Sequence, residues 1–192
     1  MVIRGEWVAS VLVDAYDVGW VRRGEAVVRE VAGGLGSLAV RVEHIGSTAV
    51  PGMAAKPVFD VQASVLDLDV AFDGPLTGLG FERLPYQHDH VPAGCGDSPA
   101  LWVKRFWLRR GDGVEPVNLH LRLAGSPNER LALLFRDWFR AHPAAVPAYA
   151  AFKSVLAVAV DGDLDAYTEV KDPVVDLVAV VAEEWAAATG WG

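Results

Sequence analysis

Two segments in the middle of the chain, residues 57–65 and 114–123, alternate apolar and polar residues with the period of two that is typical of a β-strand. We predict that each strand has one apolar face, packed under helices, and one polar face. The apolar faces carry Phe59, Val61, Ala63 and Val65 in the first strand and Val117, Leu119, Leu121 and Leu123 in the second. The polar faces carry Val58, Asp60, Gln62 and Ser64 in the first strand and Asn118, His120 and Arg122 in the second. If the strands are neighbours, Asp60, Gln62, Asn118 and His120 converge.

Along the whole chain, strands dominate the middle and helices dominate the third that follows residue 126. This order predicts an α+β fold with a mixed or antiparallel sheet, formed by one domain over residues 1–192. Its sheet-containing core would be 1–125 and its helical section 126–192, with proline and glycine residues marking the ends of helices. The expected helices are 19–35, 68–79, 128–141, 144–160 and 164–188, the further strands are 38–45, 81–86 and 100–109, and the loops are 46–56 and 87–99.

Composition narrows the classes of protein that fit. Of the 192 residues, 52% are hydrophobic and seven are Trp, which is enough for a sizeable core. The net charge of −8 argues against a general nucleic-acid binder, because such proteins need a basic face. The single cysteine, Cys95, excludes an intramolecular disulfide and fits a reducing compartment. The first residues lack a signal-peptide pattern and the apolar stretches are too short to span a bilayer, so we expect a cytoplasmic protein.

A carboxylate inside an apolar strand needs a partner, because an isolated buried charge is costly. Asp60 follows a loop, 46–56, that begins with Gly46 and Ser47. A loop with exposed backbone N–H groups beside a carboxylate is typical of sites that hold phosphate next to a metal ion. The plainer alternative is that the polar face is simply exposed to solvent, as in many antiparallel sheets.

Glu43 to Val61, which read EHIGSTAVPGMAAKPVFDV, resemble the signature of the GrpB family. The segments VNLHL (117–121), FRDWFRAHPAAVPAYAAFKSVLA (135–157) and DAYTEVK (165–171) are similar to later parts of the same family. This resemblance implies a nucleotidyltransferase-like fold. It also implies that the loop of Gly46, Ser47 and Thr48 holds a nucleotide phosphate and that Asp60 ligates Mg²⁺.

The sequence departs from the acidic pattern of the nucleotidyltransferase superfamily. Gln62 stands where a second acid would be, and the strand expected to bring a third acid offers Asn118 and His120. Two-metal transfer normally needs more than one carboxylate, because Mg²⁺ prefers anionic oxygen. We therefore expect at most one Mg²⁺, at Asp60, with His120 as the base for an acceptor and Gln62 beside it in the catalytic set.

Four cations are candidates for binding phosphate: Lys56 before the second strand and Arg136, Lys153 and Lys171 in the helical section. Tyr149 precedes Lys153 by four residues, so that both lie on one helix face, and Tyr167 precedes Lys171 by the same spacing. The alternative for each cation is a solvated helix face or an ion pair.

Several other residues have open alternatives. His88 and His90 could share a metal ion, but the sequence offers no evident third ligand. Trp107, together with Arg105 and Arg109, could stack on a nucleotide base. Alternatively, Trp107 could pack in the core. His44 could fix the loop that follows it, and Glu43 could pair with Lys56 or Arg41, as structural roles.

Three functions fit these residues. The first is transfer of a nucleotidyl or phosphoryl group from a nucleoside triphosphate to a small molecule, with one Mg²⁺. The second is a module that binds a nucleotide or coenzyme A precursor without transfer, which suits a family whose domain is in some relatives fused to dephospho-CoA kinase. The third is metal-independent acid–base chemistry on a small metabolite. In each case the partner is a nucleotide or another small phosphorylated or anionic metabolite, and the sequence leaves the oligomeric state open.

Overall fold

A five-stranded mixed sheet is the centre of the computed structural model, which describes residues 12–192. The strand order is β1-β2-β5-β4-β3, in which β2 and β5 run parallel and all other neighbours run antiparallel. The strands are β1 (Arg41–Ile45), β2 (Phe59–Val65), β3 (Glu82–Leu84), β4 (Lys104–Arg109) and β5 (Val117–Leu123). The predicted α+β class with a mixed sheet is confirmed, and so is the adjacency of the two alternating strands.

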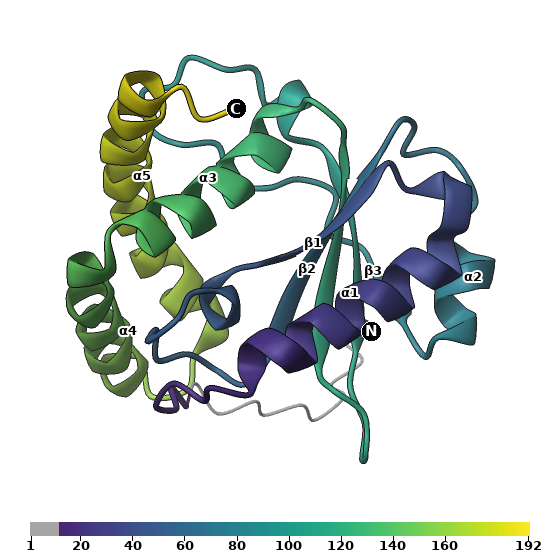
Figure 1. Cartoon of the computed structure of the whole chain (residues 1–192), viewed down its shortest axis with the longest axis horizontal. Coiled ribbons are helices and arrows are strands. Elements are labelled where there is room, and N and C mark those ends of the chain that lie inside the picture. The colour runs from purple at the N-terminus through teal and green to yellow at the C-terminus, as the bar shows by residue number, and fades with distance from the viewer. Residues whose placement is uncertain (1–11) are drawn as a thin grey trace, which may run out of the picture.

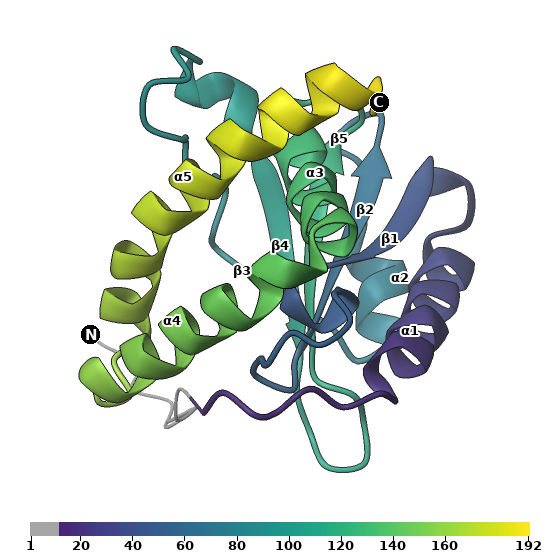
Figure 2. The ribbon, with the colours of Figure 1, turned by 60° about the vertical axis from the view of Figure 1, so that its left-hand side comes forward.

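Helices cover the sheet on both faces (Figures 1 and 2). One layer holds α1 and α2, and the other holds α3, α4 and α5, which form the predicted helical section. The helices are α1 (Trp20–Leu35), α2 (Asp73–Gly78), α3 (Pro127–Ala141), α4 (Val146–Ala159) and α5 (Leu164–Thr189). Within the described part of the chain, no helix is long and apolar enough to cross a membrane.

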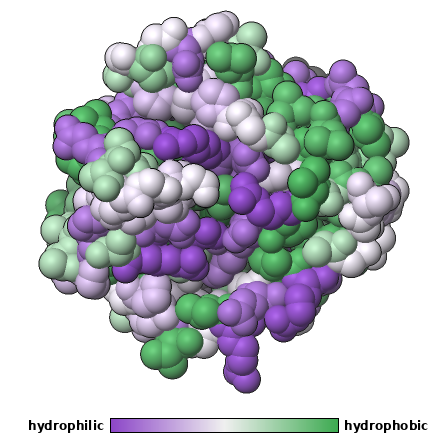
Figure 3. Space-filling view, turned by 45° about the horizontal axis from the view of Figure 1, so that its top comes forward, coloured by the Kyte–Doolittle hydropathy of each residue, from purple (hydrophilic) through white to green (hydrophobic). Residues whose placement is uncertain are grey.

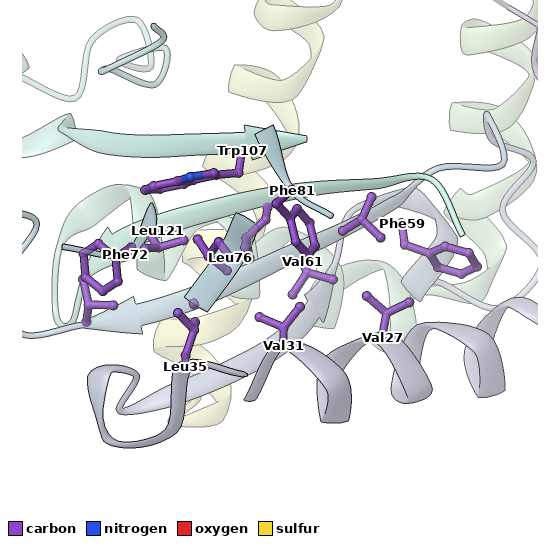
Figure 4. Packing of buried hydrophobic residues seen from close by; sticks show 14 of the residues in the cluster. Val27, Val31, Leu35, Phe59, Val61, Phe72, Leu76, Phe81, Trp107 and Leu121 are labelled. Atoms are coloured by element: carbon purple, nitrogen blue, oxygen red, sulfur yellow. The ribbon is translucent and has the colours of Figure 1, made fainter. Parts of the chain in front are cut away.

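The core lies between the sheet and α1, where the two predicted apolar strand faces meet a helical stripe (Figure 4). Val27, Val31 and Leu35 recur at helical spacing on the buried side of α1. They pack towards the apolar face of β2 and β5, and Trp107 of β4 belongs to the same cluster. This placement decides between the two alternatives for Trp107: it is a core residue and does not stack a base.

Three expected elements differ from the structure. Residues 99–102 form a 3₁₀ helix that Ser98 caps, so the expected strand 100–109 begins only at Lys104. The expected helix 68–79 shrinks to Asp73–Gly78. The expected strand 38–45 begins only at Arg41, after a 3₁₀ helix over Gly36–Leu38. The expected helix 164–188 is present as α5, with Pro173 inside it. The first eleven residues, part of the segment without a signal-peptide pattern, lie outside the described residues.

Asp163 begins α5 by capping it. Its Oδ1 accepts hydrogen bonds of 3.0 Å from the backbone N–H groups of Asp165 and Ala166, which have no partner inside the helix. We expect Asp163→Ala to lower the free energy of unfolding by about 1 kcal/mol, and Asp163→Asn to change it little. Urea unfolding measures both. Asp112→Ala, in the turn between β4 and β5, is the control, and a loss as large there would contradict the capping role.

Candidate functional site

Asp60 lies at the start of β2, on the sheet face that α3, α4 and α5 cover. Parallel pairing sets Asp60 opposite Asn118 and Gln62 opposite His120, so the predicted convergence of these residues is confirmed. Asp60 Oδ1 accepts a 2.8 Å hydrogen bond from Asn118 Nδ2, and His120 Nε2 lies 3.8 Å from the same oxygen. The Asp60 side chain is still 32% exposed. A ligand can therefore reach the carboxylate.

Gly46 explains why a Gly-Ser loop precedes Asp60. Its backbone has φ +69° and ψ −170°, a conformation that is essentially restricted to glycine. A Cβ atom at this position would lie 2.9 Å from Asp60 Cβ. The absence of a side chain thus lets the loop pass directly over the carboxylate and carries Ser47 to the same place.

Lysines gather around this carboxylate from three separate segments. Lys153, buried at 4% exposure in α4, donates to Ser47 Oγ at 2.8 Å and to the carbonyl oxygen of Ala54 at 2.7 Å. Lys56 Nζ lies 4.7 Å from the centre of the Tyr167 ring. Burial and, to a smaller extent, the nearby charge of Lys171 lower the pKa of Lys153 to about 7, although the charge of Asp60 opposes the shift. Burial and Lys171 also lower the pKa of Lys56.

We call Ser47, Lys56, Asp60, Lys153 and Lys171 the lysine cluster. The chain has only four lysines against thirteen arginines, and three of the four are in this cluster. The fourth, Lys104, lies on the same sheet face. A chain that otherwise uses arginine keeps lysine here, where a compact ammonium group with an adjustable pKa is the chemical difference between the two residues.

His120 is present as neutral imidazole. Burial lowers its pKa to about 4, with Arg122 adding to the shift and Asp60 opposing it. Arg122 Nη2 lies 3.4 Å from His120 Nδ1, so Nδ1 accepts and the proton is assigned to Nε2, which faces Asp60. The Nε2–H group points towards the Asp60 carboxylate across 3.8 Å, and the engaged Nδ1 is less available for the role of base that we expected from the sequence.

Asp60 is ionised at neutral pH. Burial alone would raise its pKa, but the contact with His120, the hydrogen bond from Asn118 and the charge of Lys171 together lower it. The site therefore combines one carboxylate with several cations.

Three predicted site residues bind other protein groups and do not face the site. Gln62 is fully buried. Its Nε2 donates a hydrogen bond to the backbone carbonyl of Glu129 at 3.2 Å, and its Oε1 accepts one from Arg122 at 2.6 Å. Thr48, also buried, bonds to His44 Nε2 at 2.9 Å and to the carbonyl of Val58 at 3.3 Å. Their amide and hydroxyl groups are already engaged, which corrects the expectation that they contact a ligand or take part in catalysis.

Arg136 is the third of these residues. It pairs with Glu43 at 2.8 Å, bonds to the carbonyl of His44 at 3.0 Å, and pairs with Asp137 at 2.7 Å. These contacts tie α3 to β1 and correct two expectations: Arg136 is a structural ion pair and not part of the lysine cluster, and the partner of Glu43 is Arg136, not Lys56 or Arg41. The hydrogen bond from His44 to Thr48 agrees with the structural role expected for His44.

Two residues of the site had no clear signal in the sequence. Arg110, just past β4, donates to Asn118 Oδ1 at 2.7 Å and to the carbonyl of Val117 at 2.9 Å, and so adds a cation near Asp60. Asp89, from the loop after β3, binds Lys104 Nζ at 2.6 Å and Arg122 Nε at 2.7 Å. Although burial alone would raise the pKa of Asp89, these two cations hold it well below its usual range.

The residues present do not fit a magnesium ion held by protein groups alone. Asp60 is the carboxylate of the cluster, Asp89 is neutralised by its own ion pairs, and lysines surround the position a cation would take. In residues 12–192 no group of three or more His, Cys, Asp or Glu side chains is placed to hold a metal. The suspected His88 and His90 pair does not form such a site either, because His90 instead contacts Asp176 at 2.9 Å.

Two surface hollows, of about 400 and 330 Å³, lie beside α1 and away from the lysine cluster. In the larger one Arg109 pairs with Glu30 at 2.7 Å, and in the smaller one Arg136 pairs with Glu43. In each hollow an arginine is thus already paired with a glutamate. On the face of the molecule that Figure 3 shows, hydrophilic and hydrophobic residues lie in separate patches. The α3–α5 side is not uniformly polar, because Val158 of α4 and Leu177 of α5 are exposed.

Comparison with known proteins gives one family. The sequence model described as GrpB protein matches residues 10–180. A protein named dephospho-CoA kinase from Mycolicibacterium paratuberculosis is 37% identical, over 91% of this chain and 46% of its own length. The protein of the same name from Mycobacterium tuberculosis strain H37Rv is 36% identical over the same shares. The chain therefore spans about half the length of these relatives.

A further relative and a solved structure agree with this result. The UPF0157 protein YqkA of Bacillus subtilis is 28% identical, over 76% of this chain and 39% of its own length. The crystal structure of conserved protein GrpB from Enterococcus faecalis superposes with a TM-score of 0.72 at 26% identity. It covers 91% of this chain and 99% of the solved chain.

Proposed function

Because this chain belongs to the GrpB family, we propose that it binds a phosphorylated ligand of the nucleotide or coenzyme A-precursor type at the lysine cluster. The observation that carries the proposal is the excess of cations around one reachable carboxylate. Burial, with the nearby like charge of Lys171, lowers the pKa values of Lys56 and Lys153, and this lowering reflects the cost of keeping both lysines charged. A phosphate group would remove it, since phosphate oxygens accept hydrogen bonds from several ammonium groups at once.

The relatives make coenzyme A precursors a reasonable ligand class. Those named dephospho-CoA kinase are about twice as long as this chain, so the kinase activity belongs to the whole of those proteins. A domain that accompanies such an enzyme could bind its substrate, its product or its nucleotide. All three carry phosphates on a nucleoside.

The small number of carboxylates at the site favours binding without nucleotidyl transfer. Two-metal transfer needs carboxylates that hold both ions, and here Asp60 stands alone while Gln62 is buried and engaged. Mg²⁺ would then bind only together with the ligand, coordinated by the ligand's phosphates. Acid–base chemistry on the bound ligand is a second candidate, favoured by the pKa of about 7 at Lys153, because a group that titrates near the working pH can both accept and donate a proton.

Calorimetry with ADP, ATP and dephospho-CoA, each with and without Mg²⁺, tests the proposal. We expect one of them to bind, and Lys171→Met to weaken binding by about tenfold or more, the usual worth of a hydrogen bond to a charged group. Arg130→Met is the matched control, because it also removes one positive charge but at an exposed pair with Glu183. Absence of binding by all three ligands, with and without Mg²⁺, would overturn the proposal. Equal losses in both variants would show only a general charge effect and would also count against it.

A further inference from the structure

A row of aromatic rings leads away from the lysine cluster along the same sheet face. The His120 ring, beside Asp60, has its centre 4.8 Å from that of Phe106, its partner on β4. The Phe106 ring in turn has its centre 6.0 Å from that of Tyr86, just past the end of β3, at an angle of 70°. The row crosses β5, β4 and the edge of the sheet. Phe106 is thus two strands from Asp60, which corresponds to about 10 Å.

The outer rings of this row are accessible. Tyr86 is 58% exposed and Phe106 is half-buried, whereas Trp107, the next residue on β4, is 1% exposed in the core on the opposite face. Half-buried Leu84 lies opposite Phe106, so the surface beside the rings is apolar. A cross-strand aromatic pair stabilises a sheet, but that role alone does not require a ring left open beside a group of cations.

Charged groups next to the row are already paired. Lys104 Nζ lies 5.3 Å from the centre of the Phe106 ring and is bound to Asp89 at 2.6 Å. The strip therefore offers ring faces and apolar surface, while the free cations stay at the lysine cluster. A ligand that matches both parts has phosphates at one end and a flat aromatic group at the other, joined by a spacer of the size of a ribose.

We propose that Tyr86 and Phe106 form the subsite for the base of a nucleotide whose phosphates lie at the lysine cluster. The inference rests on the proposed function and makes it more specific, because it separates a nucleotide from a sugar phosphate or inorganic diphosphate. Base–aromatic stacking tolerates any base, since every base has a π-face. The subsite therefore selects for the presence of a base and not for one particular base.

A matched pair of ligands tests this inference. AMP and ribose 5-phosphate carry the same phosphate on the same sugar and differ only in the base, and calorimetry can compare them on the wild type and on Phe106→Leu and Tyr86→Leu. We expect AMP to bind the wild type about tenfold or more tightly than ribose 5-phosphate, and at least one variant to lose most of that ratio. Binding of ribose 5-phosphate should be unchanged in both variants, which controls for damage to the fold.

The other possible results contradict either the aromatic subsite or the proposed function. Equal affinity of AMP and ribose 5-phosphate for the wild type would overturn the aromatic subsite and leave the phosphate site intact. A preference for AMP that survives in both variants would also overturn it, because the base would then bind elsewhere. If AMP and inorganic diphosphate fail to bind, and ADP, ATP and dephospho-CoA fail as well, the proposed function itself fails.

Discussion

Replacing Lys153 with Met is expected to stabilise the ligand-free protein at pH 6 relative to the wild type, and to lose this advantage as the pH rises to 9. The folded-state pKa of Lys153 is about 7, against an ordinary value of 10.5. Between these values the unfolded chain binds more protons than the folded one, so wild-type stability increases with pH. Below pH 7 both states are protonated, and the cost of the buried charge is felt in full.

The size of the effect follows from the same two values. One proton whose pKa differs between the states changes stability by about 1.4 kcal/mol per pH unit, so from pH 6 to pH 9 the wild type should gain about 3 kcal/mol over Lys153→Met. Urea unfolding at pH 6, 7.5 and 9 measures it. Arg130→Met, which removes a cation that does not titrate, should run parallel to the wild type. Parallel curves for Lys153→Met as well would show that Lys153 is not perturbed.

The protonation of Lys153 is also coupled to ligand binding. An anion beside Lys153 restores the charged form, so binding above pH 7 must take up a proton and affinity should fall as the pH rises towards 9. The same would hold for the cluster as a whole: the proposed phosphate would relieve the cost of keeping these partly buried lysines charged. Part of the binding free energy would then come from the relief of that cost.

Alternation along two strands was enough to predict which side chains converge around Asp60. A strand has a period of two, so once β2 and β5 are neighbours Asp60, Asn118 and His120 must share a face. Lys153 and Lys171 could be suggested as partners because the family resemblance extends over their helices. The scarcity of lysine was a further signal in the sequence, since a chain of thirteen arginines has three of its four lysines in the lysine cluster.

The roles of the supporting residues could not be predicted in this way. Gln62 and Arg122 are 60 residues apart, and Arg136 and Glu43 are 93 apart. Whether a polar side chain faces a ligand or a buried partner depends on which helix covers it, and a strand pattern does not contain that information. For the same reason the ion pairs of Asp89 with Lys104 and Arg122 could not be predicted from the sequence.

Gly46→Ala is expected to be among the most damaging single substitutions in the site. Its backbone conformation, with φ +69° and ψ −170°, costs a residue with a side chain about 1–3 kcal/mol. The new methyl group would also overlap Asp60, and overpacking of that kind costs about 1–3 kcal/mol more. We therefore expect a loss of about 2–6 kcal/mol in the free energy of unfolding, together with loss of ligand binding in any folded remainder.

Gly190→Ala separates the two causes, because Gly190 also has positive φ, at +70°, but no atom within 4 Å of an added Cβ. Gly190→Ala should lower the free energy of unfolding by about 1 kcal/mol, as expected for a residue with a side chain in the left-handed conformation at a helix end. Asp60→Gly, alone and combined with Gly46→Ala, then isolates the overlap in a double-mutant cycle. If the loop and the carboxylate are built against each other, the double variant will recover at least about 1 kcal/mol relative to the sum of the single changes. Simple additivity would mean that backbone strain alone requires the glycine, and that the close approach of the loop to Asp60 contributes nothing to stability.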